Sequence, residues 1–79
     1  MERKSALVAV KEVITEVCGC EPREETQRIK QDLGIDSLAL VAVVVALEEK
    51  FGIAFDDGDL DPARLVEVGD LAELVCKSL

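Results

Sequence analysis

Ten consecutive apolar residues, Leu38 to Leu47, limit most strongly how this 79-residue chain can fold. The run holds four Val, which favour strands, but no second strand-like run exists to pair with it. Its Leu and Ala residues and its charged exit into Gly52 favour a helix, which we predict over about 37–51. Such a helix is apolar nearly all round, so it is either buried or offers a surface to a partner. Ten residues are about half of the ~20 that a membrane span needs, and we expect no such span.

Two further helices are predicted from apolar residues at three- and four-residue spacing. The first is capped by Ser5 or a residue before it and ends at Gly19, and its apolar positions are Leu7, Val10, Val13, Ile14 and Val17. The last runs from about Gly69 to Ser78, and its apolar positions are Val68, Leu71, Leu74 and Val75.

A short third helix is predicted after Asp61, with Pro62 at its first position, through Leu65 or Val66. The polar stretch Glu21 to Arg28 ends at one apolar residue, Ile29, which we expect to anchor this loop in the core. The prediction is therefore an all-α fold, a small four-helix bundle with a short third helix and no sheet. It forms a single domain over residues 1–79.

The charge of the chain excludes several classes of function. Seventeen acids and nine bases give a net charge of −8, which disfavours nucleic acid and anionic membranes and favours basic partners. Residues 37–79 hold nine acids and three bases, so we expect an electrostatic docking face in the second half. His, Trp and Tyr are absent, which removes the commonest general base and leaves no base-stacking platform.

Metal and catalytic sites are not indicated. Asp57, Asp59 and Asp61 have the spacing that opens an EF-hand loop, but Pro62 and Val68 stand where Gly and Glu are needed. Ser37 has no His or Lys in its sequence setting that could activate it, so we expect no enzyme. The chain has three cysteines, Cys18, Cys20 and Cys76, and an odd number is a poor basis for disulfide bonds. We therefore expect reduced thiols in the cytoplasm that are buried or without a function. Cys76 is expected to face inward.

The segment Asp32-Leu33-Gly34-Ile35-Asp36-Ser37-Leu38 carries the most specific signal in the chain. It is followed nine residues later by Leu47-Glu48-Glu49-Lys50-Phe51-Gly52-Ile53, and then by Val68-Gly69-Asp70-Leu71. A lone Asp-Ser-Leu is usually only a helix cap, but the three segments together resemble the acyl carrier proteins over essentially the whole chain.

The resemblance implies that Ser37 carries a 4′-phosphopantetheine arm, transferred from coenzyme A, whose thiol holds acyl groups as thioesters. Asp36 would help a phosphopantetheinyl transferase recognise the site, beside Leu38. The partners implied are that transferase and the acyl-transferring and condensing enzymes, with basic docking surfaces, of fatty-acid, polyketide or related biosynthesis. We expect a monomeric, non-catalytic carrier in the cytoplasm.

The chain departs from the family on its second helix, where Ala39 and Ala42 replace exposed acids. Docking to partners is therefore either more hydrophobic or shifted toward the acidic loop Asp56 to Asp61. The residues expected to take part in docking are Ala39, Val41, Ala42, Glu48 and Glu49. Peptide-type carriers usually have Gly where Ile35 stands, which makes an amino-acid cargo a weaker prediction. The alternative function is an unmodified helical interaction module whose Ser37 is only a cap.

Overall fold

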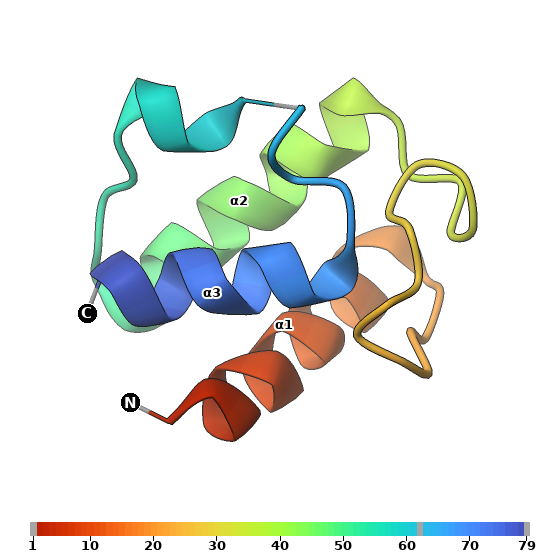
Figure 1. The fold of residues 1–79 in the computed structure, drawn as a ribbon, viewed down its shortest axis with the longest axis horizontal. Coiled ribbons are helices and arrows are strands. Elements are labelled where there is room, and N and C mark those ends of the chain that lie inside the picture. The colour runs from red at the N-terminus through yellow and green to blue at the C-terminus, as the bar shows by residue number, and fades with distance from the viewer. Residues whose placement is uncertain (1, 62, 79) are drawn as a thin grey trace.

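The computed structural model describes residues 2–61 and 63–78, apart from the side chains of Asp57 and Asp59. It contains α1 (Arg3–Cys18), α2 (Ser37–Phe51), the 3₁₀ turn η1 (Asp57–Leu60) and α3 (Val68–Ser78). In Figure 1, α3 crosses in front of α2 and α1 lies beneath them, and α1 packs against both. The all-α class predicted from the sequence is therefore confirmed. No helix in the described part of the chain is long and apolar enough to cross a bilayer.

The helix ends follow local sequence chemistry. α2 occupies the predicted range, with Asp36 as its N-cap and Gly52 as its C-cap in the left-handed conformation at φ 64°. Gly19 ends α1 in the same conformation, at φ 72°, and its N–H donates to the Thr15 carbonyl. Glycine adopts positive φ without the steric penalty of a Cβ atom, which is why both helices stop where predicted. At the start of α1, the N-cap position belongs to Glu2, whose side chain makes no capping bond.

The predicted short third helix is not present as an α-helix among the described residues. Its predicted start at Pro62 lies outside them, residues 63–64 form only a turn, and the extra helical turn comes earlier, at η1. The N–H groups of Arg64 and Leu65 donate to the Asp61 carbonyl and close one turn, and the Val66 carbonyl then accepts a 2.7 Å hydrogen bond from the Ile29 N–H of the first loop. Three α-helices and one 3₁₀ turn thus stand where four helices were predicted.

The core gathers buried aliphatic residues from every helix and from both long loops. Ile29 is 2% exposed, which confirms that it anchors the first loop, and the four predicted positions of the last helix are all buried. On α1, Val10, Val13 and Ile14 are buried, whereas Leu7 is only half-buried and Val17 is 40% exposed at the end of the helix. The core residues are Ala6, Val10, Val13, Ile14, Ile29, Ile35, Val43, Val44, Leu47, Phe55, Leu65, Val68, Leu71, Ala72, Leu74 and Val75.

The first loop is joined to the start of α3 by backbone hydrogen bonds. Besides the Ile29 bond, the N–H groups of Val68 and Gly69 donate to the carbonyls of Gln27 and Glu25, at 3.0 and 2.8 Å. A Cβ on Gly69 would lie 3.3 Å from the Glu25 oxygen, so glycine permits this close approach. The first loop and the start of α3 are therefore joined in one hydrogen-bonded frame.

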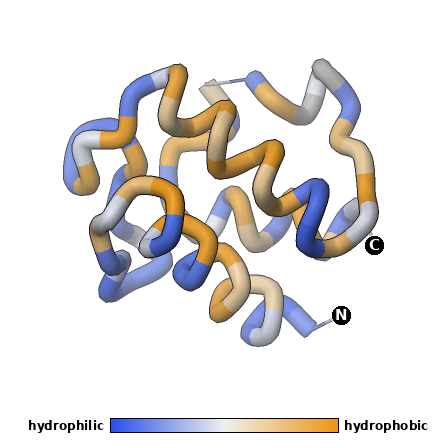
Figure 2. The backbone as a smooth tube through the Cα atoms, turned by 180° about the vertical axis from the view of Figure 1, so that it is seen from behind, coloured by the Kyte–Doolittle hydropathy of each residue, from blue (hydrophilic) through white to orange (hydrophobic). Residues whose placement is uncertain are grey.

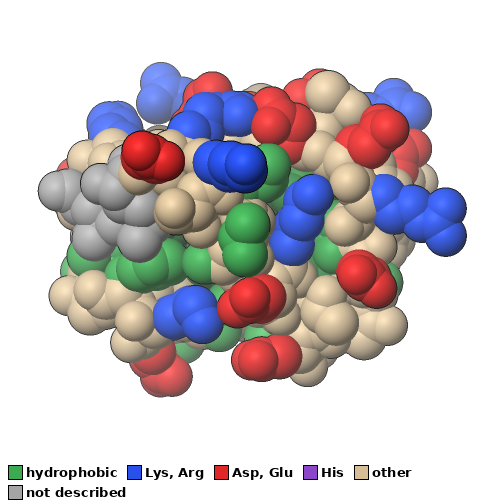
Figure 3. Space-filling view, turned by 90° about the horizontal axis from the view of Figure 1, so that it is seen from below, with side chains coloured by type: hydrophobic (Ala, Val, Ile, Leu, Met, Phe, Trp, Pro, Cys, Tyr) green, Lys and Arg blue, Asp and Glu red, His purple; other side chains and the backbone are tan. Residues whose placement is uncertain are grey.

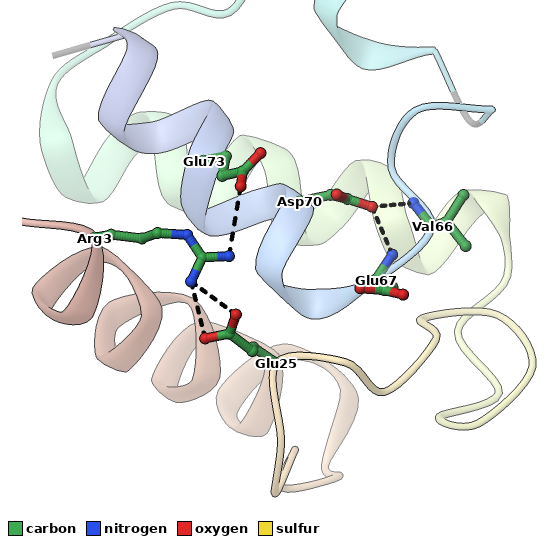
Figure 4. Close-up of polar contacts among 6 residues, drawn as sticks. All are labelled: Arg3, Glu25, Val66, Glu67, Asp70 and Glu73. Carbon is green, nitrogen blue, oxygen red and sulfur yellow. Dashed lines mark hydrogen bonds and ion pairs between the residues drawn. The ribbon is translucent and has the colours of Figure 1, made fainter.

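Side chains reinforce this frame (Figure 4). The Arg3 guanidinium bonds both carboxylate oxygens of Glu25, at 2.8 and 2.9 Å, and lies 3.5 Å from Glu73 of α3. The Asp70 carboxylate accepts from the N–H groups of Val66 and Glu67, which caps the start of α3. The Arg3 pairs are exposed and contribute little stability, whereas the cap fixes the chain just after Leu65.

Candidate functional site

The serine singled out by the sequence is the first residue of α2. Ser37 is exposed, and the preceding Asp36 accepts a 2.8 Å hydrogen bond through Oδ1 from the Ala39 N–H. A helix start leaves its first N–H groups without acceptors in the helix, and Asp36 satisfies one of them. Asp36, and not Ser37, is therefore the N-cap of α2, so the Ser37 hydroxyl is not committed to that role. An anion attached there would lie at the positive end of the helix dipole.

A narrow apolar groove of about 160 Å³ begins at Ser37 and runs beside α2. Six of its seven lining residues are Leu or Val, which makes it suited to an aliphatic chain. Four of these come from α2 and the other two from η1 and the segment before α3, and they are Leu40, Val41, Val44, Val45, Leu60 and Leu65. We call this the α2 groove.

A second, smaller cavity of about 80 Å³ also includes Ser37 in its lining. It shares Ser37, Leu40 and Leu65 with the α2 groove, but its remaining lining includes the charged residues Lys30 and Asp36. We call it the loop cavity, because the first loop forms its wall. Ser37 therefore borders both an apolar groove and a cavity with a partly charged lining.

Another hollow lies away from Ser37. It measures about 450 Å³ and lies over α1 and the start of the first loop, with Lys11, Glu12 and Glu16 in its lining. Its lining residues include no catalytic set of side chains. The α2 groove, although smaller, is the hollow next to the candidate serine.

The outer face of α2 is exposed and apolar. Its side chains include Leu38 at 82% exposure, Val41 at 59% and Val45 at 45%. Ala42 is also exposed, and together with Glu49 these positions follow the three- and four-residue spacing of one helix face. Seen from behind in Figure 2, α2 forms a largely apolar stretch of backbone that ends in hydrophilic residues. We call these five residues the outer α2 face.

Two residues expected at a docking surface have structural roles in the fold. Ala39 is half-buried and supplies the N–H that Asp36 caps. Glu48 is also half-buried, and its Oε2 accepts a 2.9 Å hydrogen bond from the Phe55 N–H. Of the two adjacent glutamates, Glu49 alone is exposed.

Charge is distributed unevenly over the surface. The side of the molecule that carries α1 presents Lys and Arg side chains interspersed with acids, as Figure 3 shows from below. Lys50 of α2 lies 3.8 Å from Glu12 of α1. In the acidic loop Asp61 accepts from the Ala63 N–H, and within the described residues no group of three potential metal ligands is found.

The cysteines lie partly buried against the core, at the end of α1 and on α3. Burial raises the pKa of the Cys18 thiol, and the nearby Cys20 and Asp36 raise it further. Because the thiolate is the reactive form, this environment disfavours Cys18 as a nucleophile. Cys76 is half-buried, as its predicted inward position required.

Sequence reasoning identified Ser37 but missed the far wall of the groove. Leu60 and Leu65 stand in the groove although they are 23 and 28 positions from Ser37. Nothing in their local sequence marks them as groove residues, because only the folding of the chain after α2 brings them there.

The chain is similar in sequence and in fold to known proteins. The family described as "Phosphopantetheine attachment site" matches residues 8–75. An acyl carrier protein of Thermotoga maritima is 37% identical over 79 residues, covering 98% of this chain and 95% of that protein. The meromycolate extension acyl carrier protein of Mycobacterium tuberculosis is 38% identical over 77 residues, and the match covers 65% of its length. The crystal structure of an acyl carrier protein from Thermotoga maritima superposes with a TM-score of 0.81 at 28% identity, covering 99% of this chain and 91% of that one.

Proposed function

The chain belongs to the phosphopantetheine attachment site family and functions as an acyl carrier, and we propose that Ser37 is the residue that bears the prosthetic group. An acyl carrier works with biosynthetic enzymes and is not itself catalytic. The observation that carries the assignment to Ser37 is its exposed position at the start of α2, at the end of the apolar groove. We propose that residues 1–79 act as one carrier domain.

Attachment requires only that Ser37 be an accessible acceptor. Its Oγ would bond to the phosphorus of coenzyme A nearest the pantetheine, while the bond from that phosphorus to the leaving adenosine bisphosphate breaks. The hydroxyl proton would pass to a base of the phosphopantetheinyl transferase, since this chain offers no His. The product is an anionic phosphodiester, which a helix N-terminus favours by roughly 0.3–1 kcal/mol at an exposed site.

The prosthetic group, 4′-phosphopantetheine, supplies a terminal thiol that holds acyl groups as thioesters. Around its attachment point the chain offers two surfaces of different chemistry. The α2 groove is almost wholly aliphatic and suits the hydrocarbon part of a cargo, whereas the loop cavity includes Lys30, whose ammonium suits a phosphate. We propose that the groove shelters acyl chains between reactions.

We propose that partner enzymes bind the outer α2 face. Leu38 and Asp36 lie beside Ser37, where the transferase must approach, and Val41 and Ala42 continue the same exposed surface. Glu49 provides a negative charge at the far end for a basic residue of the partner. Ala39 and Glu48 would contribute indirectly, by fixing the two ends of the helix. The proposal includes a cytoplasmic, monomeric carrier in fatty-acid, polyketide or related biosynthesis.

The test is an intact mass measured after incubation with coenzyme A, Mg²⁺ and a broad-specificity phosphopantetheinyl transferase. The wild type should gain one phosphopantetheine. Ser37→Ala should gain none, while Ser5→Ala, the same change at another exposed serine, should gain one. Modification of Ser37→Ala would assign the site elsewhere. No gain by a folded, previously unmodified wild type would favour an unmodified interaction module.

A further inference from the structure

We propose that Lys30 binds the phosphate of the prosthetic group on Ser37, and so turns the first bonds of the arm toward the first loop. The inference rests on the proposed attachment at Ser37 and adds a residue that holds the attached group. It starts from the loop cavity of about 80 Å³, whose lining includes both Ser37 and Lys30. Among the described residues that line this cavity, Lys30 is the only base. The phosphorus would be bonded directly to the Ser37 Oγ, so the phosphate would lie at the edge of this cavity.

The backbone of the first loop brings Lys30 to the start of α2. The Ile35 N–H donates to the Ile29 carbonyl at 3.0 Å, which closes the loop between these two residues. Ile29 is 2% exposed, and its own N–H donates to the Val66 carbonyl at 2.7 Å. Lys30 directly follows this fixed residue, and Ser37 lies two positions after Ile35. The exposed lysine and the exposed serine therefore meet at one cavity.

The positive charge of Lys30 has no acidic partner in the part of the chain that the structure describes. Arg28, by contrast, lies 3.4 Å from the Asp32 carboxylate, which also accepts a 2.8 Å hydrogen bond from the Arg28 N–H. Asp36 lines the same cavity as Lys30, but its Oδ1 accepts from the Ala39 N–H and no ion pair joins it to Lys30. The Lys30 ammonium is therefore available to a new anion.

Attachment of the arm would place a second negative charge next to Asp36. The phosphodiester would be bonded to the neighbouring residue, and two like charges a few ångströms apart repel each other. The net charge of −8 on the chain adds to this repulsion. The Lys30 ammonium would reduce it, together with the positive end of the α2 dipole. The dipole acts along the helix axis, whereas Lys30 lies on the loop side, so Lys30 would determine the direction in which the phosphate turns.

The experiment compares stability with and without the arm. A phosphopantetheinyl transferase loads the wild type, Lys30→Gln, Lys30→Arg and Lys4→Gln, and mass spectrometry confirms each product. Urea denaturation gives the unfolding equilibrium constant of every unmodified and loaded form. The factor by which loading lowers this constant should be about two- to fivefold smaller in Lys30→Gln than in the wild type at low salt. At 1 M salt the difference should disappear, because the Debye length falls to about 3 Å.

Two variants and a spectroscopic signal distinguish phosphate binding from a merely structural role. Lys30→Arg keeps the charge and should behave as the wild type does. Lys4→Gln is the matched control and should also behave as the wild type, because Lys4 is an exposed lysine of α1 outside the loop cavity. The ³¹P chemical shift of loaded Lys30→Gln should differ from that of the loaded wild type in the folded state and equal it in urea.

Three results would overturn the role of Lys30 and leave Ser37 as the attachment point. They are an equal effect of loading in the wild type and Lys30→Gln, identical ³¹P shifts in the two folded proteins, and an effect of Lys4→Gln as large as that of Lys30→Gln. Failure of a folded, previously unmodified wild type to load would instead overturn the assignment of Ser37, and the role of Lys30 with it.

Discussion

The carboxylate of Glu48 accepts a 2.9 Å hydrogen bond from the backbone N–H of Phe55, seven residues later in the chain. The Glu48 carbonyl also accepts from Ile53, at 3.0 Å, so one residue holds the turn that leaves α2. Phe55 is 8% exposed and belongs to the core, which makes this turn part of the packed structure. Two adjacent glutamates with the same charge thus have different roles.

We predict that Glu48→Ala lowers the free energy of unfolding by about 1–2 kcal/mol, because the Phe55 N–H loses a charged acceptor at a half-buried position. Glu49→Ala should change it by less than about 0.5 kcal/mol, since Glu49 is exposed. Urea denaturation followed by circular dichroism measures both. Equal losses in the two variants would show that the Glu48 bond does not stabilise the turn.

The cap and the charge of Asp36 can be separated. Asp36→Asn should keep the stability of α2, because Asn caps helices about as well as Asp, whereas Asp36→Ala should cost about 1 kcal/mol. If the transferase recognises the carboxylate, both variants should be modified more slowly than the wild type. Denaturation and a timed mass measurement distinguish the two effects. Modification of Asp36→Asn at the wild-type rate would assign Asp36 to capping alone.

The outer α2 face should bind partners through apolar contact. With the broad-specificity transferase as the partner, we predict that Val41→Asp raises KM by about tenfold, which corresponds to ~1.4 kcal/mol of binding free energy. Val8→Asp is the control, because Val8 is similarly exposed at 51% but lies on α1.

Salt distinguishes the two docking modes that the sequence left open. If apolar contact dominates, KM should change little between low and high ionic strength, and Glu49→Lys should have a smaller effect than Val41→Asp. A KM that rises steeply with salt, together with a wild-type value for Val41→Asp, would shift docking to the acidic residues.

The thiol of Cys18 should alkylate slowly at neutral pH. Burial raises its pKa, with further contributions from Cys20 and Asp36, so less of the reactive thiolate is present at a given pH. Its reaction with iodoacetamide, followed by peptide mass mapping, should increase only at a higher pH than in the urea-unfolded protein. Asp36→Asn removes one of the nearby negative charges and should move the profile to lower pH. Identical folded and unfolded profiles would contradict the environment described for Cys18.

Several features of the fold and site could be predicted because their causes are local. Asp36 and Gly52 bound α2 where the sequence placed its ends, since a capping carboxylate and a residue tolerant of positive φ act on the nearest backbone. The residues beside Ser37 also led to its prediction as the acceptor. The apolar face of α3 was predicted correctly, because polar residues alternate with apolar ones at helical spacing.

The short third helix was not predictable in the same way. Asp61 and Pro62 have the composition of a helix start, yet the following Val66 carbonyl pairs with Ile29, more than 30 residues earlier. The N–H groups of Val66 and Glu67, which a longer helix would direct four residues back, are bonded to the Asp70 carboxylate instead. The helix propensity of this segment is therefore overridden by its pairing with Ile29 and by the capping of α3.

The sequence by itself determined that a long apolar helix begins at an exposed serine and that the chain is an acidic, all-α acyl carrier. It could not determine which side of that helix is buried, because apolar residues occupy almost every position and leave no helical period to read. Packing against α1 and the loops buries Val43, Val44 and Leu47 and leaves Leu38 and Val41 exposed. The side chains that close the groove also come from distant segments, so the space for cargo exists only in the tertiary structure.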